Sequence, residues 1–288
     1  MEITLNGLKR LGSWKKLFRR ECVSLSRTRP EPSAFFITTL EERCVLNGSF
    51  DGTGGTIVLD GFDVGVDIAI DQNGSDYDFV LSSGTWTGTD IGSDVVASGA
   101  TLSVRNDFAT TILIDDTDGN DPNIEFDRVN FNDLDATDSL TLVGVGEVTQ
   151  TPDDGSGTDE RIQVEELIIN GATLVALANP ENDFDVVSVT ATGDVDLTDR
   201  NEIEIGTTAI SNSGKLTVTA DGHITQTSGE SASVAGSTTL TTTSSGNITF
   251  DGSANNLSGQ LVLNSDGDAT IHNEVDKQIG SSTVNIKS

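Results

Sequence analysis

The turn at residues 115–121 (DDTDGND) carries the oxygen-rich side chains of this sequence that are best suited to bind a cation. Counting Gly119 as the sixth position of an EF-hand loop places Asp116 third and Asp118 fifth. Glu125 then falls at the twelfth position, but an isoleucine occupies the first, and the flanking runs have strand character. The pattern predicts either an irregular Ca²⁺ loop or a solvated acidic turn. The candidate Ca²⁺ ligands are Asp116, Asp118, Asp121 and Glu125.

The residue types give little support to enzymatic chemistry. His223 and His272 lie far apart in the chain beside glycines, which predicts surface positions rather than a catalytic pair. Asp194, Asp196 and Asp199 share one turn, but no base or nucleophile accompanies them, and we interpret them as a solvated face. No glycine-rich phosphate loop or Cys/His metal spacing occurs. We predict that the protein is not an enzyme, with a carbohydrate-active β-helix enzyme as the second alternative.

The charge of the chain is distributed unevenly. Residues 1–50 contain nine Lys/Arg and five Asp/Glu, a net charge of +4, whereas residues 51–288 carry a net charge of −34. So acidic a body repels nucleic acids and anionic membranes and attracts divalent cations. The low aromatic content (5%) and the 30 glycines predict a thin core of aliphatic rows between polar turns.

The basic leader, residues 1–50, has an apolar stripe at spacings of three and four residues. Its members are Leu5, Leu8, Leu11, Trp14 and Phe18. Because basic residues fill the other faces, the stripe predicts an amphipathic targeting helix. The alternatives are a helix that caps the first β-layer and a disordered tail. No apolar run approaches the roughly 18 residues of a membrane span.

Residues 40–46 (LEERCVL) resemble the LEPR-XLL leader, a Leu-Glu-Pro-Arg-x-Leu-Leu signature near the N-terminus of large surface or secreted proteins of planctomycetes and related bacteria. The matching residues are Leu40, Glu41, Arg43 and Leu46. Glu42 replaces the proline and Val45 a leucine. The resemblance implies export, and with it an extracellular or cell-surface location.

Residues 51–139 contain short runs with strand character, separated by Asn-Gly, Asp-Gly and Ser-Gly pairs. The runs are residues 56–59, 66–70, 79–81, 101–104 and 111–114. Asn73-Gly74 is suited to close a hairpin, as in an antiparallel sandwich. We interpret the region instead as an irregular β domain, made of early coils of the repeat that follows.

The repeat is plainest near residue 220. Residues 216–225 (LTVTADGHIT) recur as residues 240–249 (LTTTSSGNIT), with six of ten positions identical, and we call this the short repeat. A long repeat, about three times the length of the short one, relates Leu140 to Leu216, Gly193 to Gly267 and Asn182 to Asn255. Together they predict coils of about 25 residues that are grouped in units of about 75.

A coil of that length with two or three short strands is typical of a parallel β-helix. Strands of successive coils pair in parallel about 4.8 Å apart, with aliphatic rows inside and Thr, Asp and Asn outside. Glycines 193, 222, 246 and 267 are expected at one corner, in a left-handed bend. The predicted fold is all-β, a right-handed parallel β-helix (solenoid) whose regular coils occupy residues 140–288.

Residues 189–199 (VTATGDVDLTD) and 216–226 (LTVTADGHITQ) resemble the β-helical passenger repeats of filamentous haemagglutinin-like adhesins and the giant repeat proteins of planctomycetes. The resemblance implies an exported structural or adhesive protein at the bacterial cell surface, with cell-surface glycans or proteins as partners. The first alternative is a calcium-binding surface-layer or matrix component. Because the chain stops within a repeat, we expect further repeats of a longer chain or a partner that covers the last coil.

Overall fold

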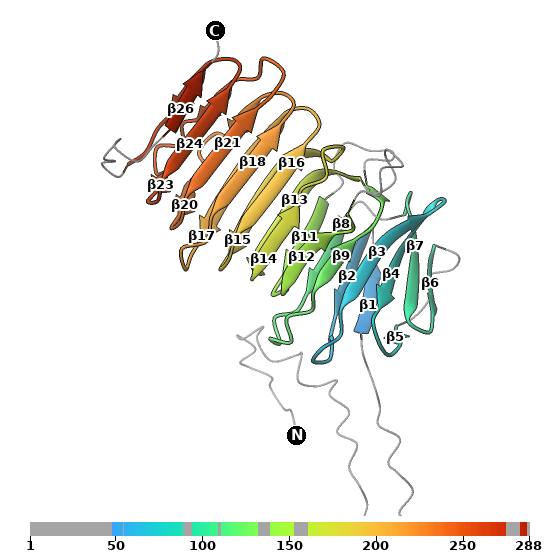
Figure 1. Ribbon diagram of the computed structural model, residues 1–288. Helices are drawn as coiled ribbons and strands as arrows, with labels where there is room; N and C mark the ends of the chain where they lie inside the picture. Colours follow the sequence, from blue (N-terminus) through green and yellow to red (C-terminus); the bar gives the residue numbers. More distant parts are fainter. Residues whose placement is uncertain are drawn as a thin grey trace, which may run out of the picture. The chain divides into compact units, whose positions relative to one another are not determined.

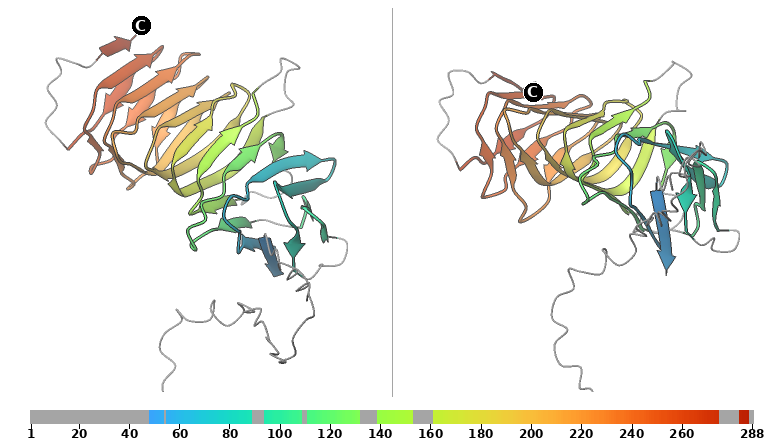
Figure 2. Two further views of the ribbon diagram at one scale, coloured as in Figure 1. Left: turned by 60° about the horizontal axis from the view of Figure 1, so that its bottom comes forward. Right: turned by 90° about the horizontal axis from the view of Figure 1, so that it is seen from below.

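The computed structural model describes residues 48–53, 55–88, 94–108, 111–131, 139–152, 161–274 and 283–286. They belong to the second of the two units of the chain, Leu46–Ser288. The described residues form strands and turns without a helix, and parallel strands stack into a β-solenoid of about six turns (Figure 1, Figure 2). This confirms the predicted all-β parallel solenoid. The predicted basic leader lies outside the described residues, apart from its last three positions.

The strands form two sheets, A and B, of 14 and 12 strands. The order in sheet A is β25 (Ala269–Ile271), β22 (Ile248–Phe250), β19 (Ile224–Gln226), β17 (Ile203–Ile210), β15 (Asp183–Ala191), β13 (Ile162–Ala172), β11 (Ser139–Val143), β8 (Thr111–Asp115), β2 (Thr56–Asp60), β1 (Gly48–Thr53) and β5 (Trp86–Thr87). Beside this path lie β10 (Val129–Asn130), β20 (Ala232–Val234) and β23 (Asn256–Leu257). The order in sheet B is β26 (Thr283–Ile286), β24 (Leu261–Ser265), β21 (Thr238–Thr242), β18 (Leu216–Ala220), β16 (Val195–Asp199), β14 (Leu174–Leu177), β12 (Glu147–Gln150), β9 (Ile124–Phe126), β3 (Ile68–Asn73), β4 (Asp76–Leu81), β7 (Thr101–Arg105) and β6 (Val95–Ser98).

Sheet A itself bends into two faces. β17 pairs with β19 through residues 203–205 and with β20 through residues 208–210. β13 likewise pairs with β10 near its start and with β11 farther along. At the bend of β17 lies Gly206, where a Cβ would stand 2.2 Å from the Ser188 Oγ of β15. We call the half that contains β19 face A1 and the half that contains β20 face A2, so that each coil runs through A1, A2 and sheet B in turn.

The core consists of stacked aliphatic rows. In β18 the side chains of Leu216, Val218 and Ala220 are buried, and the threonines between them face outward. The parallel register places Val218 beside Leu240 of β21, and Leu240 beside Leu263 of β24. Because successive strand residues alternate between the two sides of a sheet, the predicted inward aliphatic rows and outward polar rows follow from one pattern.

The corner glycines form two rows instead of the single row predicted. Gly193 lies between face A2 and sheet B, and the other three, Gly222, Gly246 and Gly267, lie between sheet B and face A1. A Cβ on Gly246 would stand 1.8 Å from the carbonyl oxygen of Gly222, and one on Gly193 would stand 2.1 Å from that of Thr173. None of the four has a positive φ, so close stacking of the coils, and not a left-handed bend, requires glycine here. Since both corners impose this contact, glycine spacing does not distinguish them.

The short repeat is in register on face A1 and out of register on sheet B. Ile224 pairs with Ile248, its counterpart in the short repeat. In sheet B, however, Leu240 pairs with Val218 and not with its counterpart Leu216. The corner after β21 has five residues and the corner after β18 has three. These two additional residues shift the pairing on sheet B by two positions relative to the short repeat.

The long repeat does not return a residue to the same face of the solenoid. Leu140 lies on sheet A in β11, whereas Leu216 lies on sheet B in β18. Asn182 lies in the corner that leads into face A1 at β15, and Asn255 lies in the corner between faces A1 and A2, from β22 to β23. The long repeat is therefore not a whole number of coils.

The surroundings of the two asparagines are nevertheless the same. Asn182 accepts a hydrogen bond from Gln150 Nε2 (2.8 Å) and donates one to Gln150 Oε1 (3.0 Å). Asn255 forms the same double hydrogen bond with Gln226, with both distances 2.8 Å. Each asparagine Oδ1 also accepts the backbone N–H of the first residue of a strand, β13 or β20. The long repeat thus places one buried corner structure on successive faces of the solenoid.

The beginning of the described chain departs from the coil pattern. β1 and β2 form an antiparallel hairpin, and so do β3 and β4, with Asn73 and Gly74 at the turn. Sheet B ends in the antiparallel strands β4, β7 and β6 (Figure 1). In the same region β2 pairs in parallel with β8, and β3 with β9. Residues 51–139 therefore combine coil strands with an antiparallel end, which we call the cap (β1, β4, β5, β6 and β7).

Candidate functional site

Asp116 is the most buried of the predicted Ca²⁺ ligands. It is 2% exposed, and its Oδ2 accepts the backbone N–H groups of Asn120 (2.7 Å) and Asp121 (2.6 Å). Burial raises the pKa of the Asp116 carboxyl, against the lowering effect of these two N–H groups. Gly119, within the turn, has a φ of +83°. Asp116 therefore stabilises the turn by accepting its backbone donors.

The other predicted ligands are not gathered around this carboxylate. Asp118 and Asp121 are exposed, and Glu125 faces outward on β9. In the part of the chain that the structure describes, no group of three or more His, Cys, Asp or Glu side chains is placed to hold a metal ion. The buried Oδ1 of Asp116 has no hydrogen-bond partner among these residues. Calcium binding stays a prediction.

The two histidines are exposed, as predicted. His223 precedes β19, and its Nδ1 accepts the backbone N–H of Asn247 in the next coil (2.9 Å). His272 follows β25. Each belongs to a corner of the solenoid, and His223 links two coils.

Asp194, Asp196 and Asp199 do not form one solvated face, contrary to the prediction. Asp194 is exposed at a corner, and Asp196 faces outward from β16, where burial raises its pKa. Asp199 is 2% exposed and points into the core. It stands three residues after Asp196, and side chains an odd number of positions apart in a strand point to opposite sides.

Asp199 belongs to a buried polar network at the corner between β16 and β17. Its two oxygens accept the backbone N–H groups of Phe184 (2.6 Å) and Asn201 (2.8 Å). Burial raises its pKa to about 7, against the lowering effect of these donors. Burial also opposes ionisation of the neighbouring Asp183, but hydrogen bonds from Gln163, Asn201 and Arg200 hold the pKa of Asp183 below its usual value. The network ties three coils together at one corner.

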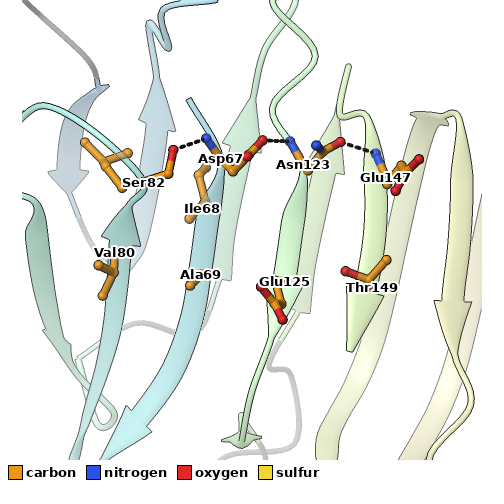
Figure 3. A pocket seen from close by; sticks show the side chains of 10 residues that line it. Asp67, Ile68, Ala69, Val80, Ser82, Asn123, Glu125, Glu147 and Thr149 are labelled. Carbon is orange, nitrogen blue, oxygen red and sulfur yellow. Dashed lines mark hydrogen bonds between the residues drawn. The ribbon is translucent and has the colours of Figure 1, made fainter. Parts of the chain in front are cut away.

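A groove on the outer surface of sheet B is the best candidate for a ligand site (Figure 3). It has a volume of about 370 Å³ and crosses β4, β3, β9 and β12; we call it the sheet B groove. The lining residues are Asp67, Ile68, Ala69, Val80, Leu81, Ser82, Asn123, Glu125, Glu147 and Thr149. This lining combines carboxylates, an amide and hydroxyls with aliphatic groups.

The floor of the groove follows from the register of four strands. Val80 pairs with Ala69, Ala69 with Glu125, and Glu125 with Thr149. All four side chains face outward from their strands: the residues on either side of Val80, Ala69 and Glu125 are buried in the core, and so is Val148 before Thr149. The short methyl group of Ala69 between the larger Val80 and Glu125 side chains accounts for the depression.

One edge of the groove is a chain of side chain to backbone hydrogen bonds across four strands (Figure 3). Ser82 Oγ accepts the N–H of Asp67 (2.9 Å), and Asp67 Oδ1 accepts the N–H of Asn123 (3.2 Å). Asn123 Oδ1 in turn accepts the N–H of Glu147 (2.8 Å). Each bond satisfies a backbone donor at the start of a strand, so the edge is positioned by the stack itself.

The sheet B groove holds three carboxylates, from Asp67, Glu125 and Glu147, and the described residues that line it include no Lys, Arg or His. It therefore offers negative charge and hydrogen-bond acceptors. These are only part of the catalytic groups that a carbohydrate-active enzyme, the second alternative, would need. Of its lining, the sequence singled out Glu125, but as a calcium ligand of the preceding turn. The groove has one signal in the sequence, a polar residue followed by Ile or Val and then an outward residue, at residues 67–69, 123–125 and 147–149. This pattern is meaningful only once the three segments are known to be neighbours.

The described residues include no helix long and apolar enough to cross a membrane. Residues 192–264 match a family model described as repeats of unknown function (DUF5649). No curated protein and no solved structure matches the chain. The matched segment runs from the corner before β16 to β24 and lies wholly within the parallel coils, so the comparison agrees with a repeat protein.

Proposed function

We propose that this protein is an exported structural and adhesive β-solenoid, displayed at or released from the bacterial cell surface. The observation that carries the proposal is the outward side of the coils. In β18 and β21, Thr217 pairs with Thr239 and Thr219 with Thr241, so that small polar side chains stand in rows along sheet B. A surface of repeated polar groups supports many weak contacts, which together give avidity.

The energetics of the fold support a display role. Each coil packs against its neighbours alone, so the stack extends by addition of coils without a larger core. The net charge of −34 in residues 51–288 keeps such a surface soluble and repels nucleic acids and anionic membranes. The resemblance of residues 40–46 to the LEPR-XLL leader supports export.

Export is tested first, because the adhesive role depends on it. Antibodies raised against the full chain should label intact cells of the producing organism, and an added protease should remove the label. Antibodies against a cytoplasmic enzyme should label lysed cells only. Labelling that requires lysis would reject the proposal.

Adhesion is tested by deletion and by coating. A deletion strain should attach less to its natural surface, and beads coated with the full-length protein should gain attachment relative to beads coated with albumin. Equal attachment in both comparisons would leave a structural role and remove the adhesive one.

A calcium-dependent surface or matrix component is the second candidate. The observation in its favour is the buried Asp116 Oδ1, which has no hydrogen-bond partner among the described residues and belongs to an acidic turn. A cation would satisfy this oxygen and offset the charge of the turn. The response of thermal unfolding to Ca²⁺, described below, separates the two candidates.

A further inference from the structure

The sheet B groove lies where the backbone of the sheet is already paired. β3 is hydrogen-bonded to β4 on one side and to β9 on the other, and β9 is hydrogen-bonded to β3 and β12. An extended peptide binds to a sheet by pairing with an unpaired edge strand. No such edge is available in the groove, so a ligand there must be recognised by side chains.

The side chains of the groove accept hydrogen bonds and carry negative charge. Asp67, Glu125 and Glu147 supply carboxylate oxygens, and Thr149 supplies a hydroxyl group. A carboxylate only accepts hydrogen bonds, so the matching ligand is rich in donors such as hydroxyl or ammonium groups. Phosphate, sulfate or uronate groups would be repelled, because the lining contains no cationic side chain.

The groove is also large enough for part of a sugar chain. Its volume of about 370 Å³ falls within the range of about 300–1,000 Å³ typical of ligand sites. Ala69 and Val80 place methyl groups on the floor, where the C–H face of a sugar ring can pack, and the polar edge from Asp67 to Glu147 runs beside them (Figure 3). The hydrogen-bond chain along that edge holds Asp67 and Asn123 in place before a ligand arrives, which lowers the entropic cost of binding.

We propose that the sheet B groove binds a linear glycan of neutral or amino sugars. The proposal rests on the adhesive function proposed above and names the class of ligand for it. The contacts come from the carboxylates of Asp67, Glu125 and Glu147, with the ring faces over Ala69. Negatively charged glycans are excluded by the same carboxylates.

The test uses the full-length protein and four probes: cellotetraose, chitotetraose, glucosamine tetramer and tetragalacturonate. Saturation-transfer NMR and calorimetry should show binding of at least one of the first three with a Kd of about 1 mM, and no binding of tetragalacturonate. Ala69→Leu fills the floor from an outward position and should weaken binding at least about tenfold. Ala209→Leu, the matched control, makes the same outward change in β17 on sheet A, away from the groove, and should leave binding unchanged.

Glu125→Gln keeps the size of the side chain and removes its charge. It should weaken binding of the glucosamine tetramer more than binding of the two neutral probes, because only the amino sugar carries positive charge. Failure of all three probes, binding of tetragalacturonate, or unchanged affinity in Ala69→Leu would each overturn the proposal. If the protein binds a glycan but is not exported, the adhesive function is rejected and the groove assignment stands. If the protein is exported but binds none of the probes, the groove assignment is rejected and the adhesive function stands.

Discussion

The cap and the coils of this solenoid bury different kinds of side chain. The cap and the strands beside it pack large rings, with Phe62 and Trp86 in an edge-to-face contact at 5.9 Å and Tyr77 near Phe131 at 4.6 Å. The coils beyond residue 139 contain aliphatic rows together with nearly all the buried polar side chains of the described residues. In that described part of the chain, Asp116 is the one such side chain that precedes residue 139.

The difference follows from strand pairing. Parallel coils place equivalent positions on top of one another, so one aliphatic residue per coil fills a row, and a polar corner residue meets a polar corner residue. Antiparallel hairpins at the end of the stack do not place equivalent positions on top of one another. The core there has a less regular shape, and aromatic rings fill it. Substitutions in the cap should therefore act through lost volume, and substitutions at the corners through unpaired polar groups.

Trp86→Ala should have the largest effect on stability. Trp86 is buried against Phe62, and its Nε1 donates to the carbonyl oxygen of Phe79 (2.8 Å). We expect a loss of about 3–5 kcal/mol in the free energy of unfolding, measured by urea denaturation followed by circular dichroism. Trp86→Phe should lose less, because it keeps a ring, and Val80→Ala, outward on β4, should cost little. A loss below about 1 kcal/mol for Trp86→Ala would show that the rings of the cap do not hold the end of the stack.

Asn255→Leu tests the opposite mechanism, since leucine keeps the volume and removes the amide. The Gln226 amide and the N–H of Ala232 would both lose a partner. At about 1–3 kcal/mol for each buried group left unpaired, we expect a loss of at least about 2 kcal/mol. The double variant Gln226→Leu/Asn255→Leu should recover little of this loss, because the backbone N–H groups of Ala232 and Gly252 are then both left without an acceptor.

Asn182→Leu is the matched variant on the other face. Because Asn182 and Gln150 form the same pair, its loss should equal that of Asn255→Leu within about 1 kcal/mol. Unequal losses would show that the two corners are alike in geometry and different in energy.

Asp199 makes the coils sensitive to pH. Its pKa of about 7 in the folded protein lies above the ordinary value of 3.8, so the protonated carboxyl favours the folded state. This contribution is present in acid and is lost as the pH rises from about 4 to about 7. The free energy of unfolding should fall between pH 5 and pH 7.5 by on the order of 1–2 kcal/mol through this group.

The matched variant for this effect is Asp199→Asn, which is neutral at both pH values. Its free energy of unfolding should change less between pH 5 and pH 7.5 than that of the parent chain. The remaining change belongs to other carboxyls with raised pKa, such as Asp116 and Asp196. An identical pH dependence in parent and variant would contradict the assignment of Asp199.

Calcium should have a smaller effect. A site filled at a hundred times its Kd would add about 2.7 kcal/mol to stability. We expect less than about 1 kcal/mol when thermal unfolding with EDTA is compared with millimolar Ca²⁺, because Asp116 Oδ2 already accepts two N–H groups and Asp118 is exposed. A larger rise that Asp116→Asn abolishes would favour the calcium-dependent candidate.

The sequence predicted which side chains of a strand point inward better than it predicted which segments lie side by side. The buried pattern of Leu216, Val218 and Ala220 can be read locally, because it depends only on the direction of side chains in one strand. The inward position of Asp199 could have been read by the same rule, and composition alone made it look solvated. The sheet B groove could not have been found, since Asp67 and Asn123 lie far apart in the chain and are brought together by the length of the inserted cap strands.

The short repeat does not show the register of every face, and the cause is local. The match between Leu216 and Leu240 follows identity, but the corner after β21 is two residues longer than the corner after β18. A repeat in sequence is therefore kept on face A1, where Ile224 meets Ile248, and lost on sheet B.

Paired cysteines test this register with the least disturbance of the core. In a background with Cys22→Ser and Cys44→Ser, the variant Thr217→Cys/Thr239→Cys joins residues that pair directly on the outer side of sheet B. Their Cα atoms should be about 4.8 Å apart, within the range of a disulfide. In Thr217→Cys/Thr241→Cys, which the short repeat would align, the Cα atoms are displaced farther along the strand and stand more than about 7 Å apart. Air oxidation followed by mass spectrometry should therefore find the first disulfide and not the second, and the reverse result would restore the register of the sequence repeat.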